Sequence, residues 1–248
     1  RGVGEMAEQL FPGTTTSCTL FGKGERMTLT QDIGDPIDLG DGDIIQPSLM
    51  WISSFNGQWA TSVYDLVGRL FCTNQLVGES PIFSVKHTKN HDMTFEQRTN
   101  ILHETIEHAH AVGRMARVLK DQEFTNSQFN MLIKDVVPLP RPNTDGEIHA
   151  RGERRTNMCR DAMVAKWNEE CVEFGTVYKK VKSPSEQVDV FDGNKWLAYN
   201  AVQGAEQHMI NAQFKTTIEA REKALTKAIN GKTQYASKAW EVLCGAAA

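Results

Sequence analysis

The sequence has little cysteine and no long apolar run, and each absence excludes a class of protein. Its 248 residues include five cysteines, which are widely spaced and form no C-x-x-C pair. This usage indicates neither a disulfide framework nor a zinc site and favours a reducing, cytoplasmic setting. No apolar run reaches the roughly 18 residues of a membrane span, and no charged start precedes a secretory apolar segment. We therefore expect no membrane association.

Recognisable catalytic motifs are also missing. The sequence contains no phosphate-binding G-x-x-x-x-G-K-[ST] loop, no G-x-G-x-x-G after a strand and no G-x-S-x-G nucleophile turn. The spacing of the cysteines and histidines does not indicate a catalytic Cys–His pair. These absences favour a protein that is not an enzyme and that uses no cofactor.

An overall excess of basic charge is the third absence. The formal net charge is −4, and residues 1–90 carry six Lys and Arg against ten Asp and Glu, which leaves 21 of each sign in residues 91–248. A domain that coats nucleic acid over its whole surface would be strongly basic. Any site for a polyanion in this chain is therefore a local stripe.

The N-terminal third has the pattern of an antiparallel sheet. Residues 14–21 and 26–30 are rich in β-branched side chains and flank a glycine-rich turn, so they predict a hairpin. Asn56-Gly57 separates two further strand-like runs and favours a tight type I′ turn. A last strand is expected within residues 80–87, after Pro81. Residues 1–13 are expected to form an arm or a short helix.

A long helix follows the sheet and organises the chain. From Thr94 the apolar positions Leu102, Ile106, Ala109 and Gly113 recur at helical spacing, and Thr94 with Gln97 forms a capping box at the start. We predict an α+β fold in which this helix covers an antiparallel β-meander and a mostly helical C-terminal half follows.

The expected organisation has three parts. Residues 1–137 form an α+β core with strands within 14–87, the long helix at 94–121 and a short helix at 125–137. Residues 138–149 form a flexible Pro-rich loop, and residues 150–248 form a helical region packed on the core. A second capping box, Thr125 with Gln128, marks the short helix, and a turn-rich gap is expected at 179–194.

Two segments invite a metal hypothesis. The acidic residues 32–43 resemble a calcium loop, but their spacing does not match an EF-hand and no closing glutamate follows, so a solvated turn is the favoured interpretation. His103 and His108 are five residues apart rather than the four that would place both on one helix face, so the zinc-protease pattern is missed by one residue. A polar outer helix face is the favoured alternative.

The candidate site consists of basic residues near the starts of two predicted helices, at about residues 94 and 150. Arg151, Arg154 and Arg155 fall within about one helical turn, and guanidinium groups hold phosphates through paired donors. An exposed face paired with Glu147 and Glu153 is an equally weighted alternative. The full set of predicted nucleic-acid-binding residues is Arg151, Arg154, Arg155, Arg160, Lys86 and Lys89. Aromatic side chains could stack on bases, but we assign them to the core; they are Trp51, Trp59, Trp167, Trp196 and Tyr199.

Four segments carry a resemblance to a known family. These are GRLFCTNQL, SVKHTKN before the long helix, TNMCRDAM and NKWLAYNAVQGAEQH, which together span about residues 60–244. They resemble a family found in phages and plasmids and described only as a domain of unknown function, number 932. The order of strands, long helix and further helices is also similar to that of phage single-strand annealing proteins. The first resemblance implies a role in DNA replication or recombination but supplies no catalytic residue.

The resemblance and the arginines lead to three functional hypotheses. The favoured one is a protein that binds single-stranded DNA and promotes annealing as a homo-oligomeric ring or filament in a bacterial host cytoplasm, with a phage or host replication or recombination protein as a further partner. The alternative is a structural or protein-interaction protein of a phage, which docks through the Pro-rich loop and the N-terminal arm. The second alternative is a metal-dependent enzyme that uses the residues 103–110 or 32–43.

Overall fold

A computed structural model provides the structure of the chain. It describes most of the chain, in the residues 3–57, 59–70, 75–77, 81–85, 95–144, 146, 148–174, 176–182, 186–210 and 234–245. The chain divides into two compact units, of which one contains Arg1–Met115 and Leu225–Lys232 and the other contains Ala116–Ala224 and Thr233–Ala248. The sequence-based division at residues 138–149 stays a prediction. Each unit is described separately below.

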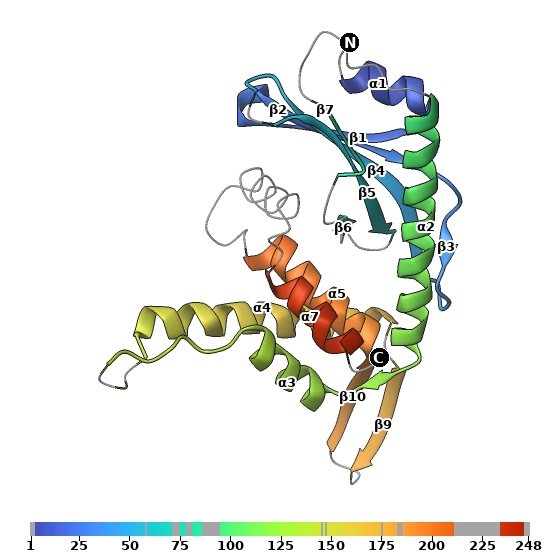
Figure 1. Cartoon of the computed structure of the whole chain (residues 1–248). Coiled ribbons are helices and arrows are strands. Elements are labelled where there is room, and N and C mark those ends of the chain that lie inside the picture. The colour runs from blue at the N-terminus through green and yellow to red at the C-terminus, as the bar shows by residue number, and fades with distance from the viewer. Residues whose placement is uncertain are drawn as a thin grey trace. The chain divides into compact units, whose positions relative to one another are not determined.

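The first unit is built on an antiparallel sheet (Figure 1). The strand order is β1-β2-β4-β5-β6, with β3 paired to β4 and β7 paired to β5. The strands are β1 (Thr15–Phe21), β2 (Arg26–Asp32), β3 (Ile37–Asp38), β4 (Ile44–Ser54), β5 (Thr61–Arg69), β6 (Gln75–Val77) and β7 (Phe83–Val85). The predicted α+β class, with an N-terminal antiparallel sheet and a largely helical C-terminal half, is confirmed.

Both predicted hairpins are present, but one turn differs from the expected type. The connection between β1 and β2 is a single 3-10 turn, Gly22–Gly24. Between β4 and β5, Gly57 has a φ of 74°, whereas Asn56 is not among the described residues with positive φ. A type I′ turn needs positive φ at both central residues. The turn is therefore not of type I′. The connection is also longer than two residues, because β4 ends at Ser54 and β5 begins at Thr61, and Phe55 is its first residue.

The arm at the N-terminus is a helix that packs on the sheet. Helix α1 (Val3–Leu10) buries Val3, Met6 and Ala7 in one core cluster with residues of β2, β4 and β5. The amide of the fully buried Gln31 donates to the carbonyl oxygen of Ala7 at 2.9 Å, and its Oε1 accepts from the indole of Trp51 at 2.7 Å. The arm is therefore anchored by apolar burial and by a satisfied buried amide.

The long helix lies close to its predicted position. Helix α2 spans Phe95–Lys120, and Ala109, Gly113 and Ala116 of the predicted stripe are buried. Its predicted cap, Thr94, lies outside the described residues. A Cβ added at Gly113 would lie 3.2 Å from the Cγ2 of Ile37 and 3.6 Å from the Cδ1 of Ile45. Glycine at this position therefore lets the helix backbone approach β3 and β4 more closely than a larger residue would.

The second unit is helical with a small sheet of its own (Figure 1). Its elements are β8 (Glu123–Phe124), α3 (Asn126–Val136), α4 (Ala150–Phe174), β9 (Thr176–Lys182), β10 (Glu186–Asn194), α5 (Lys195–Gly204), a π-helical segment (Ala205–Ile210) and α7 (Gln234–Gly245). The predicted turn-rich gap at 179–194 is wrong, because these residues form most of the β9–β10 hairpin, to which β8 pairs. The alternation of Val188 and Val190 with polar residues is typical of a strand.

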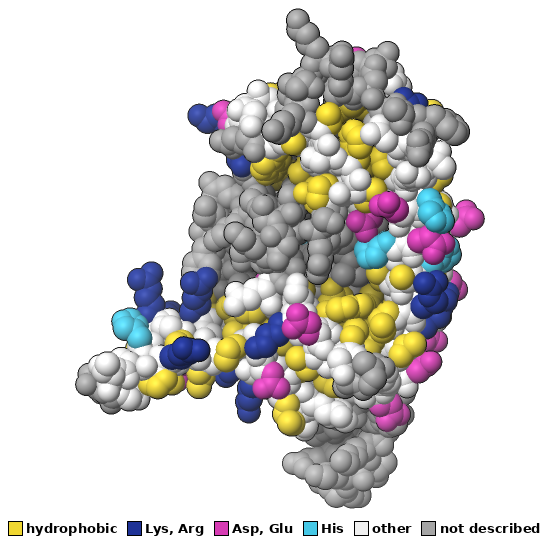
Figure 2. Space-filling model, viewed as in Figure 1, with side chains coloured by type: hydrophobic (Ala, Val, Ile, Leu, Met, Phe, Trp, Pro, Cys, Tyr) yellow, Lys and Arg dark blue, Asp and Glu magenta, His cyan; other side chains and the backbone are white. Residues whose placement is uncertain are grey.

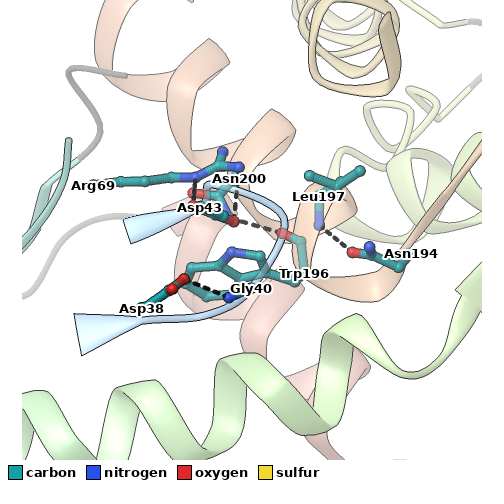
Figure 3. A network of polar contacts seen from close by, with 8 residues as sticks. All are labelled: Asp38, Gly40, Asp43, Arg69, Asn194, Trp196, Leu197 and Asn200. Atoms are coloured by element: carbon teal, nitrogen blue, oxygen red, sulfur yellow. Dashed lines mark hydrogen bonds and ion pairs between the residues drawn. The ribbon is translucent and has the colours of Figure 1, made fainter. Parts of the chain in front are cut away.

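The first unit also contains a buried ion pair (Figure 3). The Nε of Arg69 donates to Oδ1 of Asp43 at 2.6 Å, and its Nη2 donates to Oδ2 at 2.9 Å. The side chains of both residues are almost completely buried. This bidentate geometry joins the end of β5 to the residue that precedes β4. Two buried charges are stable here because each satisfies the other directly.

Replacement of Arg69 by methionine should destabilise the protein by about 3–5 kcal/mol, because the Asp43 carboxylate would remain buried without its guanidinium partner. The double variant Asp43→Asn/Arg69→Met should recover part of this loss. Urea unfolding at neutral pH measures both. Lys166→Ala is the matched control, since the exposed Lys166–Glu169 pair should contribute less than about 1 kcal/mol. Equal effects at the two pairs would contradict the assigned role of Arg69.

Candidate nucleic-acid interface

Helix α4 carries the predicted arginines, and its buried side is set by aromatic packing. Trp167 stacks on Phe129 of α3 with ring centroids 4.6 Å apart, and its indole donates to Oδ1 of Asn126 at 2.6 Å. The predicted capping box is present at the start of α3, where Thr125 accepts from the backbone N–H of Gln128. The buried side of α4 includes Ala162 and Cys171, whereas Ala165 is exposed.

The three predicted arginines lie on one exposed side of the first two turns of α4. Arg151, Arg154 and Arg155 are all exposed, and their i, i+3, i+4 spacing places them next to each other. Figure 2 shows Lys and Arg side chains gathered at this end of the helix, together with a histidine. Glu153 is exposed too, but it lies about 200° around the helix from Arg151.

The loop before α4 adds a further cation that the sequence analysis missed. A Cβ added at Gly152 would lie 2.9 Å from the Cγ of Pro140, so the loop folds back against the first turn of α4. This contact brings the neighbouring Arg141, which is exposed, to the same end of the helix. The only signal in the sequence was the Pro-Arg-Pro context, which does not specify where the loop runs. We call Arg141, Arg151, Arg154 and Arg155 the arginine cluster.

The arginine cluster is unfavourable for the helix that carries it. Cations near a helix N-terminus oppose the helix dipole, and like charges at i, i+3 and i, i+4 repel each other. Among the described residues, no ion pair joins Arg151 or Arg154 to a carboxylate. The alternative in which Glu153 pairs with Arg151 or Arg154 is therefore not met within that part of the chain, and Glu147, the other carboxylate considered, lies outside it.

Arg160 is placed differently from the other predicted arginines. It is only partly exposed, and its Nε donates to the carbonyl oxygen of Val137 at 3.0 Å. It therefore supplies a hydrogen-bond donor to the C-terminal end of α3, where the last carbonyl groups lack partners within the helix. Lys86 and Lys89 lie outside the described residues. The contribution of these three residues to nucleic-acid binding stays a prediction.

The core behind the arginine cluster includes a buried carboxylate. Oε2 of Glu206, in the π-helical segment, accepts from the backbone N–H groups of Tyr235 at 3.1 Å and Ala236 at 2.9 Å. These groups belong to the first turn of α7, where a negative charge is favoured. Burial raises the pKa of Tyr235, the neighbouring Cys159 raises it further, and Arg155 lowers it. Arg155, although exposed, is therefore close enough to Tyr235 to act on its ionisation.

Helix α5 is buried from Trp196 to its last residue, Gly204, and most of the aromatic residues assigned to the core are buried too. Its start is capped by Asn194, whose Oδ1 accepts from the backbone N–H of Leu197 at 3.0 Å (Figure 3). Assignment of the aromatic residues to the core is confirmed for Trp51, Trp167, Trp196 and Tyr199. Trp59 is half-buried, and the guanidinium of Arg26 lies 5.2 Å from its ring centroid.

The histidines of α2 do not form a metal site with the described residues. His108 forms an ion pair through Nδ1 with Oδ2 of Asp65 on β5, whereas His103 and His110 are exposed. No group of three potential ligands occurs in the part of the chain that the structure describes. The hydrogen bond that His108 donates to Asp65 raises the pKa of His108, although burial acts in the opposite direction.

The acidic residues 32–43 form a turn with internal contacts. Oδ1 of Asp38 accepts from the backbone N–H of Gly40 at 2.7 Å, and Oδ1 of Asp32 accepts from the hydroxyl of Ser48 at 2.8 Å. The expected solvated turn is wrong for Asp43, which is buried against Arg69. The carboxylates of Asp32, Asp38 and Asp43 therefore accept hydrogen bonds from groups of the protein itself.

The fold and the cluster together define the class of protein. It is an α+β protein with an exposed cluster of arginines. No described helix has the length and apolar character that crossing a bilayer requires. A family model for a "Domain of unknown function (DUF932)" matches residues 8–238, and the chain belongs to this family. The match includes the N-terminal sheet, which the sequence resemblance did not cover. Searches of curated proteins and of solved structures found no match.

The Asp65–His108 pair predicts a pH-dependent stability. Because Asp65 raises the pKa of His108 in the folded state above its usual value of 6.5, the stabilisation is complete below about pH 6.5 and is lost as the pH rises through the folded pKa. The loss of unfolding free energy in Asp65→Asn should therefore shrink as the pH is raised from about 6 to about 8.5. Urea unfolding across this range measures it, and His103→Gln is the control. If the unfolding free energy lost in Asp65→Asn stayed constant with pH, the interpretation would be contradicted.

Proposed function

We propose that the protein binds single-stranded DNA and promotes strand annealing as a homo-oligomer, without catalysing bond chemistry. The observation that carries the proposal is the arginine cluster, which is exposed and faces no described carboxylate partner for Arg151 and Arg154. Guanidinium groups bind phosphates through paired, charge-assisted hydrogen bonds. The proposed setting is the DNA metabolism of a phage or plasmid in a bacterial host cytoplasm, with a replication or recombination protein as a further partner.

The unfavourable placement of the cluster supports a binding role. Repulsion among neighbouring arginines and their position near the start of α4 both reduce the stability of the helix. Residues that cost the fold stability and make no described ion pair are typical of functional sites. A bound phosphate chain would neutralise the repulsion and place negative charge at the helix start, where it is favoured.

The proposed oligomer would explain how a protein with a net charge of −4 binds a polyanion. A single cluster contacts few phosphates, whereas a ring or filament that aligns one cluster per subunit would engage a continuous strand. Each neutralised phosphate releases counterions, so the summed contacts would make binding strongly salt-dependent. Flexible single strands can follow such a path at little bending cost, which favours them over duplex DNA.

The triple variant Arg151→Ala/Arg154→Ala/Arg155→Ala should bind single-stranded DNA more weakly than the wild type. Fluorescence anisotropy of a labelled oligonucleotide at several salt concentrations should show the slope of log affinity against log salt reduced by about two, since each contact on a single strand contributes about 0.7. Particle mass recorded on the same samples tests the oligomer. Unchanged affinity and slope would reject the cluster as the site.

The matched control removes three positive charges elsewhere. Arg98→Ala/Arg114→Ala/Lys134→Ala changes the net charge equally but leaves the cluster intact, and its binding should stay close to that of the wild type. The cluster variant should also keep or slightly raise its melting temperature, because repulsion near the start of α4 is removed. Equal losses of binding in both variants would indicate that only net charge matters.

A further inference from the structure

The first unit presents one exposed aromatic ring at the end of its sheet. Phe55, which directly follows β4, is 75% exposed, and it is the one aromatic residue among the exposed large hydrophobic side chains of the described residues. Its backbone N–H donates to the carbonyl oxygen of Glu25 at 2.7 Å. The backbone that carries the ring is therefore held in place although the ring itself is open to solvent.

Two hairpin connections meet around this ring. The register pairs Arg26 of β2 with Ser54 of β4, so the β1–β2 and β4–β5 connections lie at the same end of the sheet (Figure 1). A second bond joins them, because Nδ2 of Asn56 donates to Oε2 of Glu25 at 3.1 Å. The ring of Phe55 is thus presented by two connections that support each other, rather than by one isolated loop.

Two cations and a second ring belong to the same end of the sheet as Phe55. The guanidinium of Arg26 lies 5.2 Å from the ring centroid of the half-buried Trp59, and Lys23 is exposed in the β1–β2 connection. Lys23 has a φ of 60° in the tight Gly22–Gly24 turn, so the turn presents its side chain at the end of the hairpin. We call Lys23, Arg26, Phe55 and Trp59 the hairpin-end patch.

We propose that the hairpin-end patch is a base-stacking site for single-stranded nucleic acid, with Phe55 as the stacking ring and Lys23 as the phosphate contact. This inference rests on the proposed function and adds a second contact of different chemistry. An exposed ring and an exposed lysine on two hairpin connections that bond to each other match a chain that alternates flat apolar bases with negative phosphates. A protein partner is the other class of occupant, but cations at the same end of the sheet as an open ring favour the nucleic acid.

The two contacts should differ in their salt dependence. Stacking on Phe55 releases no counterions, whereas phosphate binding by the arginine cluster does. Phe55 should therefore contribute the same factor at low and high salt. It should also tolerate any base, because every base offers a flat face, and it should not engage duplex DNA, whose bases are already stacked.

Substitutions at Phe55 test the inference with labelled oligothymidylate. Phe55→Ala and Phe55→Leu should each weaken binding about tenfold at every salt concentration, whereas Phe55→Tyr and Phe55→Trp should bind like the wild type. The added fluorescence of Phe55→Trp should be quenched by the oligonucleotide. Leu70→Ala, which changes another exposed apolar residue of the same unit, is the control and should bind normally. Circular dichroism verifies that each variant is folded.

Each alternative result overturns the inference in a distinguishable way. Normal binding by Phe55→Ala, while the arginine triple variant fails, would reject stacking and leave the proposed function intact. Normal binding by Phe55→Leu but not by Phe55→Ala would show that apolar contact rather than stacking matters, as in docking of a protein. Failure of the wild type to bind at low salt would reject both the function and the stacking site.

Discussion

The ion pair between Arg69 and Asp43 is the contact on which the N-terminal sheet most depends. Its two charges are buried, so neither can be lost without leaving the other in an apolar environment. The pair joins the end of β5 to the start of β4 and thereby closes the acidic turn between β2 and β4. Segments distant in sequence are held in register by an interaction that does not tolerate a shift of one residue.

The same unit illustrates how a fold can carry polar groups in its core. Gln31 is fully buried, yet its amide donates to the backbone of α1 and accepts from Trp51. The apolar residues of α1 supply the affinity of the helix for the sheet, and the amide determines where along the sheet it docks. Apolar burial alone would not specify this position, because it is not directional.

Local signals allowed much of the fold to be predicted. The capping box of Thr125 and the helical spacing of α3 depend on neighbours within four residues, and they were right. The hairpin of β9 and β10 was missed because lysines and aspartates, which have low strand propensity, alternate with its valines, and pairing between the strands outweighs that propensity. Asn56-Gly57 predicted the hairpin but not its turn type, which is determined by strand ends that the dipeptide does not control.

The candidate site was only partly accessible from sequence. Three arginines on one helical turn are visible in the sequence, but Arg141 joins them only through the path of a loop. Arg160 lies on the same helix but five residues after Arg155, on a different side, and it donates to Val137. Phe55 carried no signal, since an aromatic residue at a strand end is usually buried. Exposure depends on tertiary structure, so composition and periodicity cannot supply it.

The contact of Pro140 with Gly152 affects how Arg141 would meet a ligand. A proline has a restricted backbone, and its packing against the glycine leaves the adjoining residue Arg141 few alternative paths. Arg141 consequently starts from a narrow set of positions, so its immobilisation on binding costs less conformational entropy than that of an arginine on a free loop. Any residue larger than glycine at position 152 would displace Pro140 and weaken this preorganisation while leaving all four guanidinium groups in place.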